Sequence, residues 1–143
     1  MNFIRRPRRV RLLIVEDNDI YADAVQLLLE AVDDVVVVGR ARNGAAGVEL
    51  AGTLAPDCIL MDISMPVMDG FEATRLIRDR LPATRIVMLT SSDDPVDRVQ
   101  AEAAGADAYL TKESRVEVLT AAITGAAPVR SGVVRATTAV AAA

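Results

Sequence analysis

The chain has 143 residues, 52% of them hydrophobic, which is the size of one domain with a substantial core. It has no His, which excludes Ser-His-Asp catalysis, His-based metal sites and a phosphohistidine carried by this chain. The net charge is −4, and all 20 acidic residues lie within 12–124 against eight Arg and one Lys, which argues against direct nucleic-acid binding by the folded part.

The single cysteine, Cys58, cannot form an internal disulfide, which favours a reducing compartment. After the basic start of the chain only four apolar residues precede Glu16, too few for the core of a signal peptide. No apolar run approaches membrane-spanning length. We therefore expect a cytoplasmic protein without membrane contact.

Residues 1–10 form a basic arm, which we expect to be a solvated tail; the alternative is contact with phosphate or with an acidic partner. Five strand-like apolar runs follow and alternate with helix-like stretches. The runs cover residues 11–15, 35–41, 58–61, 85–90 and 107–111.

Three of the helix-like stretches show apolar residues at helical spacing, so that each set shares one face. The three sets are Ile20, Ala24, Leu27, Leu28 and Ala31; Val96, Val99 and Ala103; and Val116, Leu119 and Ile123. Alternation of strands and helices implies right-handed crossovers, and so an α/β fold with a doubly wound parallel sheet covered on both faces. One domain should cover 11–124, with an Ala/Val-rich linker or disordered tail over 125–143.

Carboxylates follow two of the apolar runs. Glu16 and Asp17 come after the first run, and Asp62 comes after the third. If these strands are neighbours in one sheet, the three carboxylates meet at its carboxyl edge, where open α/β sheets place their chemistry. Because the carboxylates repel one another, they favour a divalent cation such as Mg²⁺.

Thr90 ends the fourth run and Lys112 follows the fifth, so both should reach the same edge. Lys112 is the only Lys among 16 basic residues. A compact ammonium on a flexible stem suits a point contact with phosphate.

These residue types fit phosphoryl transfer to a carboxylate. An Asp can attack phosphorus as a nucleophile and form an aspartyl phosphate. The reaction also needs positioning and charge neutralisation. A Mg²⁺ ion held by Asp17 and Asp62, with Glu16 close by, would supply part of this, and Lys112 would supply the rest. The Thr90 hydroxyl would donate to a phosphoryl oxygen only in the modified state, which would bias a two-state element.

Over about residues 11–124, the chain resembles the receiver domain of two-component response regulators. The resemblance implies a flavodoxin-like sheet of strand order 2-1-3-4-5. The motifs that carry it are Val15-Glu16-Asp17-Asn18, Leu60-Met61-Asp62-Ile63-Ser64-Met65-Pro66-Val67-Met68-Asp69-Gly70, Leu89-Thr90-Ser91 and Gly105-Ala106-Asp107-Ala108-Tyr109-Leu110-Thr111-Lys112.

The resemblance also implies roles for single residues. Asp62 would be the phosphoacceptor, Glu16 and Asp17 the acidic pair of the Mg²⁺ site, and the Ser64 carbonyl a further metal ligand. Thr90 would be the switch hydroxyl and Lys112 the phosphate-contacting Lys. Tyr109 would be an aromatic switch, the alternative being a plain core aromatic. Glu113 stands where many receivers have Pro, which resembles NarL/LuxR-type receivers.

We therefore expect a phosphoacceptor that takes its phosphoryl group from a sensor histidine kinase or phosphotransfer protein. Phosphorylation would then change the surface formed by the fourth helix, the fifth strand and the fifth helix. This surface could form a homodimer. The protein would act as a switch, with at most self-phosphorylation from small phosphodonors and self-dephosphorylation. Three alternatives stay open: a fragment of a NarL/LuxR-type DNA-binding regulator, a phosphorylation-independent binding module, and a Mg²⁺-dependent phosphotransfer enzyme. Ser64 stands where haloacid-dehalogenase-type enzymes carry a second Asp, which weakens the last.

Overall fold

The computed structural model describes residues 8–126. Most of the basic arm and of the Ala/Val-rich tail, residues 1–7 and 127–143, lies outside the described residues. Five parallel strands form one sheet in the order β2-β1-β3-β4-β5, which confirms the predicted order. The strands are β1 (Val10–Val15), β2 (Val35–Ala41), β3 (Cys58–Asp62), β4 (Arg85–Thr90) and β5 (Ala108–Thr111).

The observed strands agree with the predicted ones to within one residue at each end, because each strand is built around a run of apolar residues. Five helices connect and follow the strands. They are α1 (Asp19–Glu30), α2 (Gly44–Leu54), α3 (Gly70–Arg80), α4 (Pro95–Ala104) and α5 (Val116–Thr124). Among the described residues, no helix has the length and apolar character needed to cross a bilayer.

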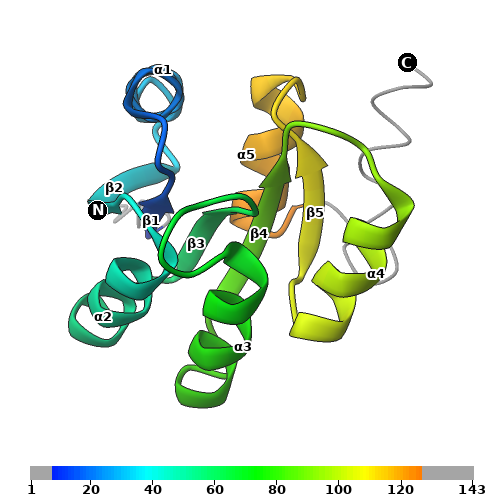
Figure 1. The fold of residues 1–143 in the computed structure, drawn as a ribbon. Helices are drawn as coiled ribbons and strands as arrows, with labels where there is room; N and C mark the ends of the chain where they lie inside the picture. Colours follow the sequence, from blue (N-terminus) through cyan, green and yellow to red (C-terminus); the bar gives the residue numbers. More distant parts are fainter. Residues whose placement is uncertain (1–7, 127–143) are drawn as a thin grey trace, which may run out of the picture.

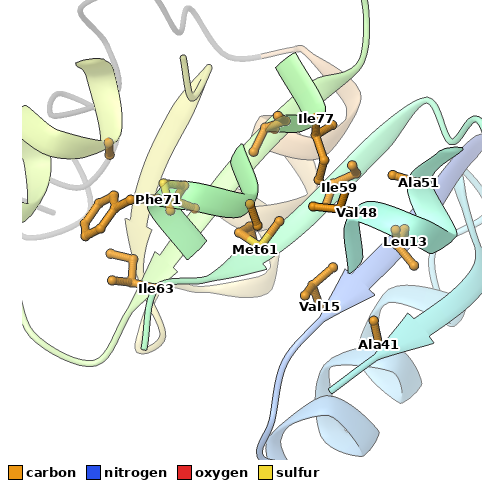
Figure 2. Close-up of a cluster of buried hydrophobic side chains, with 14 of the residues drawn as sticks. Leu13, Val15, Ala41, Val48, Ala51, Ile59, Met61, Ile63, Phe71 and Ile77 are labelled. Carbon is orange, nitrogen blue, oxygen red and sulfur yellow. The ribbon is translucent and has the colours of Figure 1, made fainter. Parts of the chain in front are cut away.

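The helices cover both faces of the sheet, with α1 and α5 on one face and α2, α3 and α4 on the other (Figure 1). Each face has its own hydrophobic core. On the second face, Figure 2 shows Val48 and Ala51 of α2 close to Leu13 and Val15 of β1. The site at the carboxyl edge is therefore supported by packed layers on both sides.

Side-chain caps fix where four helices begin. Asn18, Asn43, Asp69 and Asp94 each accept a hydrogen bond from a backbone N–H in the first turn of the following helix. Such caps satisfy amide groups that a helix leaves unpaired at its start. Because each of these helices follows a strand, the caps also fix the loops at the carboxyl edge of the sheet.

The apolar faces recognised in α1 and α4 point outward, contrary to what their periodicity suggested. On α1, Ile20 is 82% exposed and Leu27 is 74% exposed. On α4, Val96 and Val99 are also exposed. The helices instead bury Ala22, Val25 and Leu29 of α1, and Ala101 and Ala104 of α4.

Both helices thus carry two apolar faces, and periodicity cannot choose between them. The face that packs on the sheet contains small residues, Ala22 in α1 and Ala101 and Ala104 in α4, which allow close approach to the strands. The third set behaves as expected: Leu119 and Ile123 of α5 are buried, and Val116 packs against the same cluster.

Candidate functional site

The strand register brings the predicted site residues to one edge of the sheet. Val15 of β1 lies beside Met61 of β3, so the acids that follow these two residues are neighbours. Thr90 of β4 lies beside Thr111 of β5, and the backbone N–H of Lys112 donates to the Thr90 carbonyl at 2.8 Å. Ends of four adjacent strands therefore supply the site.

Glu16, Asp17 and Asp62 offer carboxylate oxygens that all lie within 4.8 Å of one another. Glu16 and Asp62 are each only 4% exposed, whereas Asp17 is open to solvent. Burial, together with the nearby Glu16 carboxylate, raises the pKa of Asp62 to about 7. The cluster is unfavourable when fully ionised, which is the condition a bound cation would relieve.

Lys112 is the cation already in contact with this cluster. Its Nζ lies 2.7 Å from Glu16 Oε1 and 3.4 Å from Asp62 Oδ1. Burial by itself lowers the pKa of Lys112, but the two carboxylates outweigh burial and raise it. The ammonium is therefore held in its charged form directly beside Asp62.

The acidic cluster fits a divalent cation by its donor set, because Mg²⁺ prefers oxygen ligands and carboxylates above all. Three carboxylates face one ammonium, so a negative excess remains. In addition, Glu16 Oε1 is buried and makes its ion pair with Lys112 without hydrogen-bond geometry. That oxygen keeps lone-pair capacity for a metal ion.

The loop after β3 carries Ser64, whose side chain is exposed. The Gly70 N–H donates to the Ile63 carbonyl at 2.8 Å, and the Gly44 N–H donates to the Met68 carbonyl at 3.0 Å. A Cβ at Gly70 would stand 2.2 Å from the Asp62 carbonyl oxygen, and one at Gly44 would stand 2.4 Å from that of Met68. Both glycines are needed for this tight loop, while the metal-ligand role of the Ser64 carbonyl stays a prediction.

Thr90 and Tyr109 meet at the loop between β4 and α4. The buried Thr90 hydroxyl donates to the Ser92 carbonyl at 2.7 Å, and the Ser92 N–H donates back to Thr90 Oγ1 at 3.2 Å. The Tyr109 hydroxyl donates to the same Ser92 carbonyl at 3.5 Å, and Tyr109 is fully buried. Thus the two predicted switch residues share one partner, and Tyr109 in this conformation is part of the core.

Sequence reasoning missed Tyr21, which also belongs to the site. Its ring centroid lies 4.7 Å from Lys112 Nζ, and its hydroxyl donates to the Lys112 carbonyl at 3.5 Å. Burial, then the Glu16 and Asp62 carboxylates, raise the pKa of Tyr21 to about 12. Its place in the first turn of the helix that follows Glu16 and Asp17 was the available signal.

A polar cavity lies next to the carboxylates, between the end of β2 and the start of α1. Its lining residues are Glu16, Asp19, Asp23, Arg40, Ala41 and Arg42. Arg40 pairs with Asp23 and Arg42 pairs with Asp19. Apart from Glu16, which pairs with Lys112, the charges of this cavity are thus paired with one another.

The chain is similar to known proteins over most of its length. The sequence model of the response regulator receiver domain matches residues 12–124. The chain is 39% identical over 116 residues to the nitrate/nitrite response regulator protein NarL of Escherichia coli K12, covering 81% of this chain and 54% of that protein. It is 36% identical over 114 residues to the transcriptional regulatory protein LnrK of Bacillus subtilis, covering 80% and 52%.

Solved structures show the same likeness. A LuxR-family two-component response regulator from Aurantimonas superposes with a TM-score of 0.79 at 28% identity, covering 92% of this chain and 96% of that one. The response regulator domain of Thermotoga maritima CheB gives 0.71 at 29% identity, with 92% and 98% covered. This chain spans about half the length of the curated relatives it matches. By fold, motifs and site, the chain belongs to the response regulator receiver domain family of two-component systems.

Proposed function

We propose that Asp62 is the phosphoacceptor of this receiver. The observation that carries the proposal is the position of the Lys112 ammonium, 3.4 Å from Asp62 Oδ1 and in contact with Glu16 at the same edge. A phosphoryl group on Asp62 would bring negative oxygens next to an ammonium that is already in place. Charge neutralisation and positioning of this kind are what phosphoryl transfer requires.

The reaction follows from these groups. A carboxylate oxygen of Asp62 attacks the phosphorus of a phosphohistidine on another protein, since this chain has no His. The new P–O bond forms as the donor P–N bond breaks, and the imidazole keeps the bonding electrons and takes a proton from solvent. Lys112 pairs with the incoming phosphoryl oxygens. Glu16, Asp17 and Asp62 would hold Mg²⁺, which when bound neutralises further charge on those oxygens.

The switch would begin at Thr90. Its hydroxyl would exchange the Ser92 carbonyl for a phosphoryl oxygen, which would pull the loop between β4 and α4 towards Asp62. Tyr109 shares the Ser92 carbonyl, so its packing would change with that loop. We propose that the surface of α4, β5 and α5 changes as a result and forms a homodimer or meets an output partner.

The relatives suggest the phosphodonor and the output. Curated relatives are transcriptional and nitrate/nitrite response regulators, and this chain spans about half their length. We therefore propose a sensor histidine kinase or phosphotransfer protein as donor, and a role as the receiver part of a LuxR-type DNA-binding regulator.

The test is intact-mass analysis after incubation with Mg²⁺ and acetyl phosphate. Wild type should gain one phosphoryl group, and Asp62→Asn should gain none. Asp57→Asn is a matched control, because Asp57 precedes the same strand at the opposite edge and pairs with Arg8. Labelling of Asp62→Asn at another residue would overturn the assignment.

One observation favours a second function, that of a phosphorylation-independent binding module. Tyr109 is fully buried in this conformation, and in the resemblance to receiver domains the buried, inward ring is the switched position. A module fixed in this conformation would bind its partner unmodified. Absence of any mass gain, together with no response to beryllofluoride, would decide for this second function.

A further inference from the structure

The Lys112 ammonium is held by three groups. Glu16 Oε1 is 2.7 Å away, Asp62 Oδ1 is 3.4 Å away, and the Tyr21 ring centroid is 4.7 Å away. The first two are carboxylates of the acidic cluster. The third is a neutral ring whose negative face attracts a cation.

The two carboxylates would not both keep their contacts with the Lys112 ammonium during the reaction. Both belong to the group that would ligate Mg²⁺, and a ligated carboxylate is oriented towards the metal ion. Asp62 would in addition become an acyl phosphate. Lysine has a flexible four-carbon stem, so an ammonium released by Glu16 has many other positions open to it. The Tyr21 ring does not compete for the metal ion and would keep its contact.

Tyr21 is itself firmly placed. Its backbone N–H donates to the capping side chain of Asn18 at 3.1 Å, in the first turn of α1. Its hydroxyl makes a long hydrogen bond, 3.5 Å, to the carbonyl of Lys112. The half-buried ring packs against the core cluster between the sheet and α1 and α5. One side chain therefore contacts both the backbone and the ammonium of Lys112.

We propose that Tyr21 is a positioning residue for phosphoryl transfer, whose ring holds the Lys112 ammonium beside Asp62 when Glu16 turns to the metal ion. The proposal rests on the proposed role of Asp62 and Lys112. It assigns the ring, and not the hydroxyl, the larger part of the effect.

Two variants separate ring from hydroxyl. Tyr21→Phe keeps the ring and removes the hydrogen bond to the Lys112 carbonyl, whereas Tyr21→Leu keeps apolar bulk on the core cluster and removes the ring. With acetyl phosphate and Mg²⁺, Tyr21→Leu should slow phosphorylation by about tenfold, the size of a half-buried cation–π contact. Tyr21→Phe should stay within about twofold of wild type. A rate for Tyr21→Leu equal to that of wild type would overturn the proposal.

A merely structural role is excluded by a double-mutant cycle. In a Lys112→Ala background, Tyr21→Leu should cause no further loss of rate, because the group that the ring positions is gone. An equal tenfold loss in both backgrounds would show that Tyr21 acts through packing and would overturn the inference.

A spectroscopic readout separates this inference from the proposed function. Lys112 is the only Lys in the chain, so its side-chain NMR signals are unambiguous. Its methylene protons next to Nζ should show an upfield ring-current shift in wild type and Tyr21→Phe, lost in Tyr21→Leu and retained after Mg²⁺ is added. This holds even if Asp62 accepts no phosphoryl group. Absence of the shift, or its loss on adding Mg²⁺, would overturn the proposal.

Discussion

At the amino edge of the sheet the Arg78 guanidinium meets the Asp107 carboxylate, whereas at the carboxyl edge one ammonium faces three carboxylates. Arg78 Nη2 lies 2.7 Å from Asp107 Oδ2, and the same guanidinium donates to the carbonyls of Gly105, Pro82 and Thr84. The Asp107 carboxylate also accepts from the Ile86 N–H. Each charged group in this cluster has a partner of opposite charge, and each remaining polar group has a hydrogen-bond partner.

The carboxyl edge has no such balance. Lys112 can neutralise only part of the charge on Glu16 and Asp62, and Asp17 adds a third carboxylate to the cluster. A structural ion pair thus differs from a ligand-binding cluster in its charge balance. The former satisfies its own charges, while the latter leaves an excess that a ligand can neutralise.

Breaking the balanced pair should have the largest effect on stability. Arg78→Ala removes the partner of Asp107 and leaves three carbonyls without their donor, so we expect a loss of about 2–3 kcal/mol. Urea unfolding should show a lower midpoint. Arg75→Ala is the matched control, because Arg75 lies on the same helix with an exposed side chain, and should stay within about 0.5 kcal/mol of wild type. Equal effects of the two substitutions would contradict the structural role of Arg78.

Removing a charge from the unbalanced cluster should raise the stability of the fold, whereas Arg78→Ala should lower it. The pKa of Asp62 is raised from 3.8 to about 7, so between these values the folded state holds a proton that the unfolded state releases. Stability should therefore fall as pH rises through this range. Asp62→Asn removes that dependence and should stabilise the metal-free protein by about 1–2 kcal/mol at neutral pH, since Lys112 keeps Glu16 as a partner.

Thermal unfolding of wild type and Asp62→Asn at pH 5 and pH 8, in the presence of a chelator, measures this difference. The two proteins should be closer in stability at the lower pH. A constant difference across the pH range, or a destabilised variant at pH 8, would mean that Asp62 is not strained by its neighbours.

A bound metal ion should offset the destabilisation that the excess negative charge causes. Mg²⁺ should raise the melting temperature of wild type, because a ligand that binds only the folded state stabilises it. Asp17→Asn removes one of the three carboxylates and should weaken binding about tenfold. Tyrosine fluorescence can follow the titration, since Tyr21 and Tyr109 are the only tyrosines. The control is Asp19→Asn, whose carboxylate pairs with Arg42 outside the cluster; equal weakening by both variants would place the ion elsewhere.

The strands were predictable from the apolar pattern of the sequence, and their order from its resemblance to receiver domains. Each strand is built around a run of apolar residues, and the residue at the end of that run reaches the carboxyl edge whatever the detailed packing. Convergence of Glu16, Asp17 and Asp62 needed only that β1 and β3 be neighbours. For this reason the site could be proposed before any contact was known.

The remaining features depend on tertiary packing. α1 carries two apolar faces, and only contact with the sheet selects the one with Val25 over the one with Leu27. The position of Tyr21 shortly after the acidic pair places it near the site, but its contact with Lys112, 91 positions away, is not reported by any local pattern. The hydrogen bond from Thr90 to Ser92 is likewise a property of one loop conformation.

The smallest effect should come from an ion pair that is near the site but outside the cluster. Arg40 Nη1 lies 2.6 Å from Asp23 Oδ1, a distance as short as any at Arg78, yet the Asp23 side chain is 71% exposed. Solvent and salt screen such a pair, so Arg40→Ala should cost no more than about 0.5 kcal/mol. Raising the salt concentration should shrink even this difference, while the loss caused by Arg78→Ala should persist, because its pair is more deeply buried and its carbonyl partners are uncharged. A loss for Arg40→Ala as large as that for Arg78→Ala would show that distance, and not burial and saturation of partners, decides the strength of the pairs in this fold.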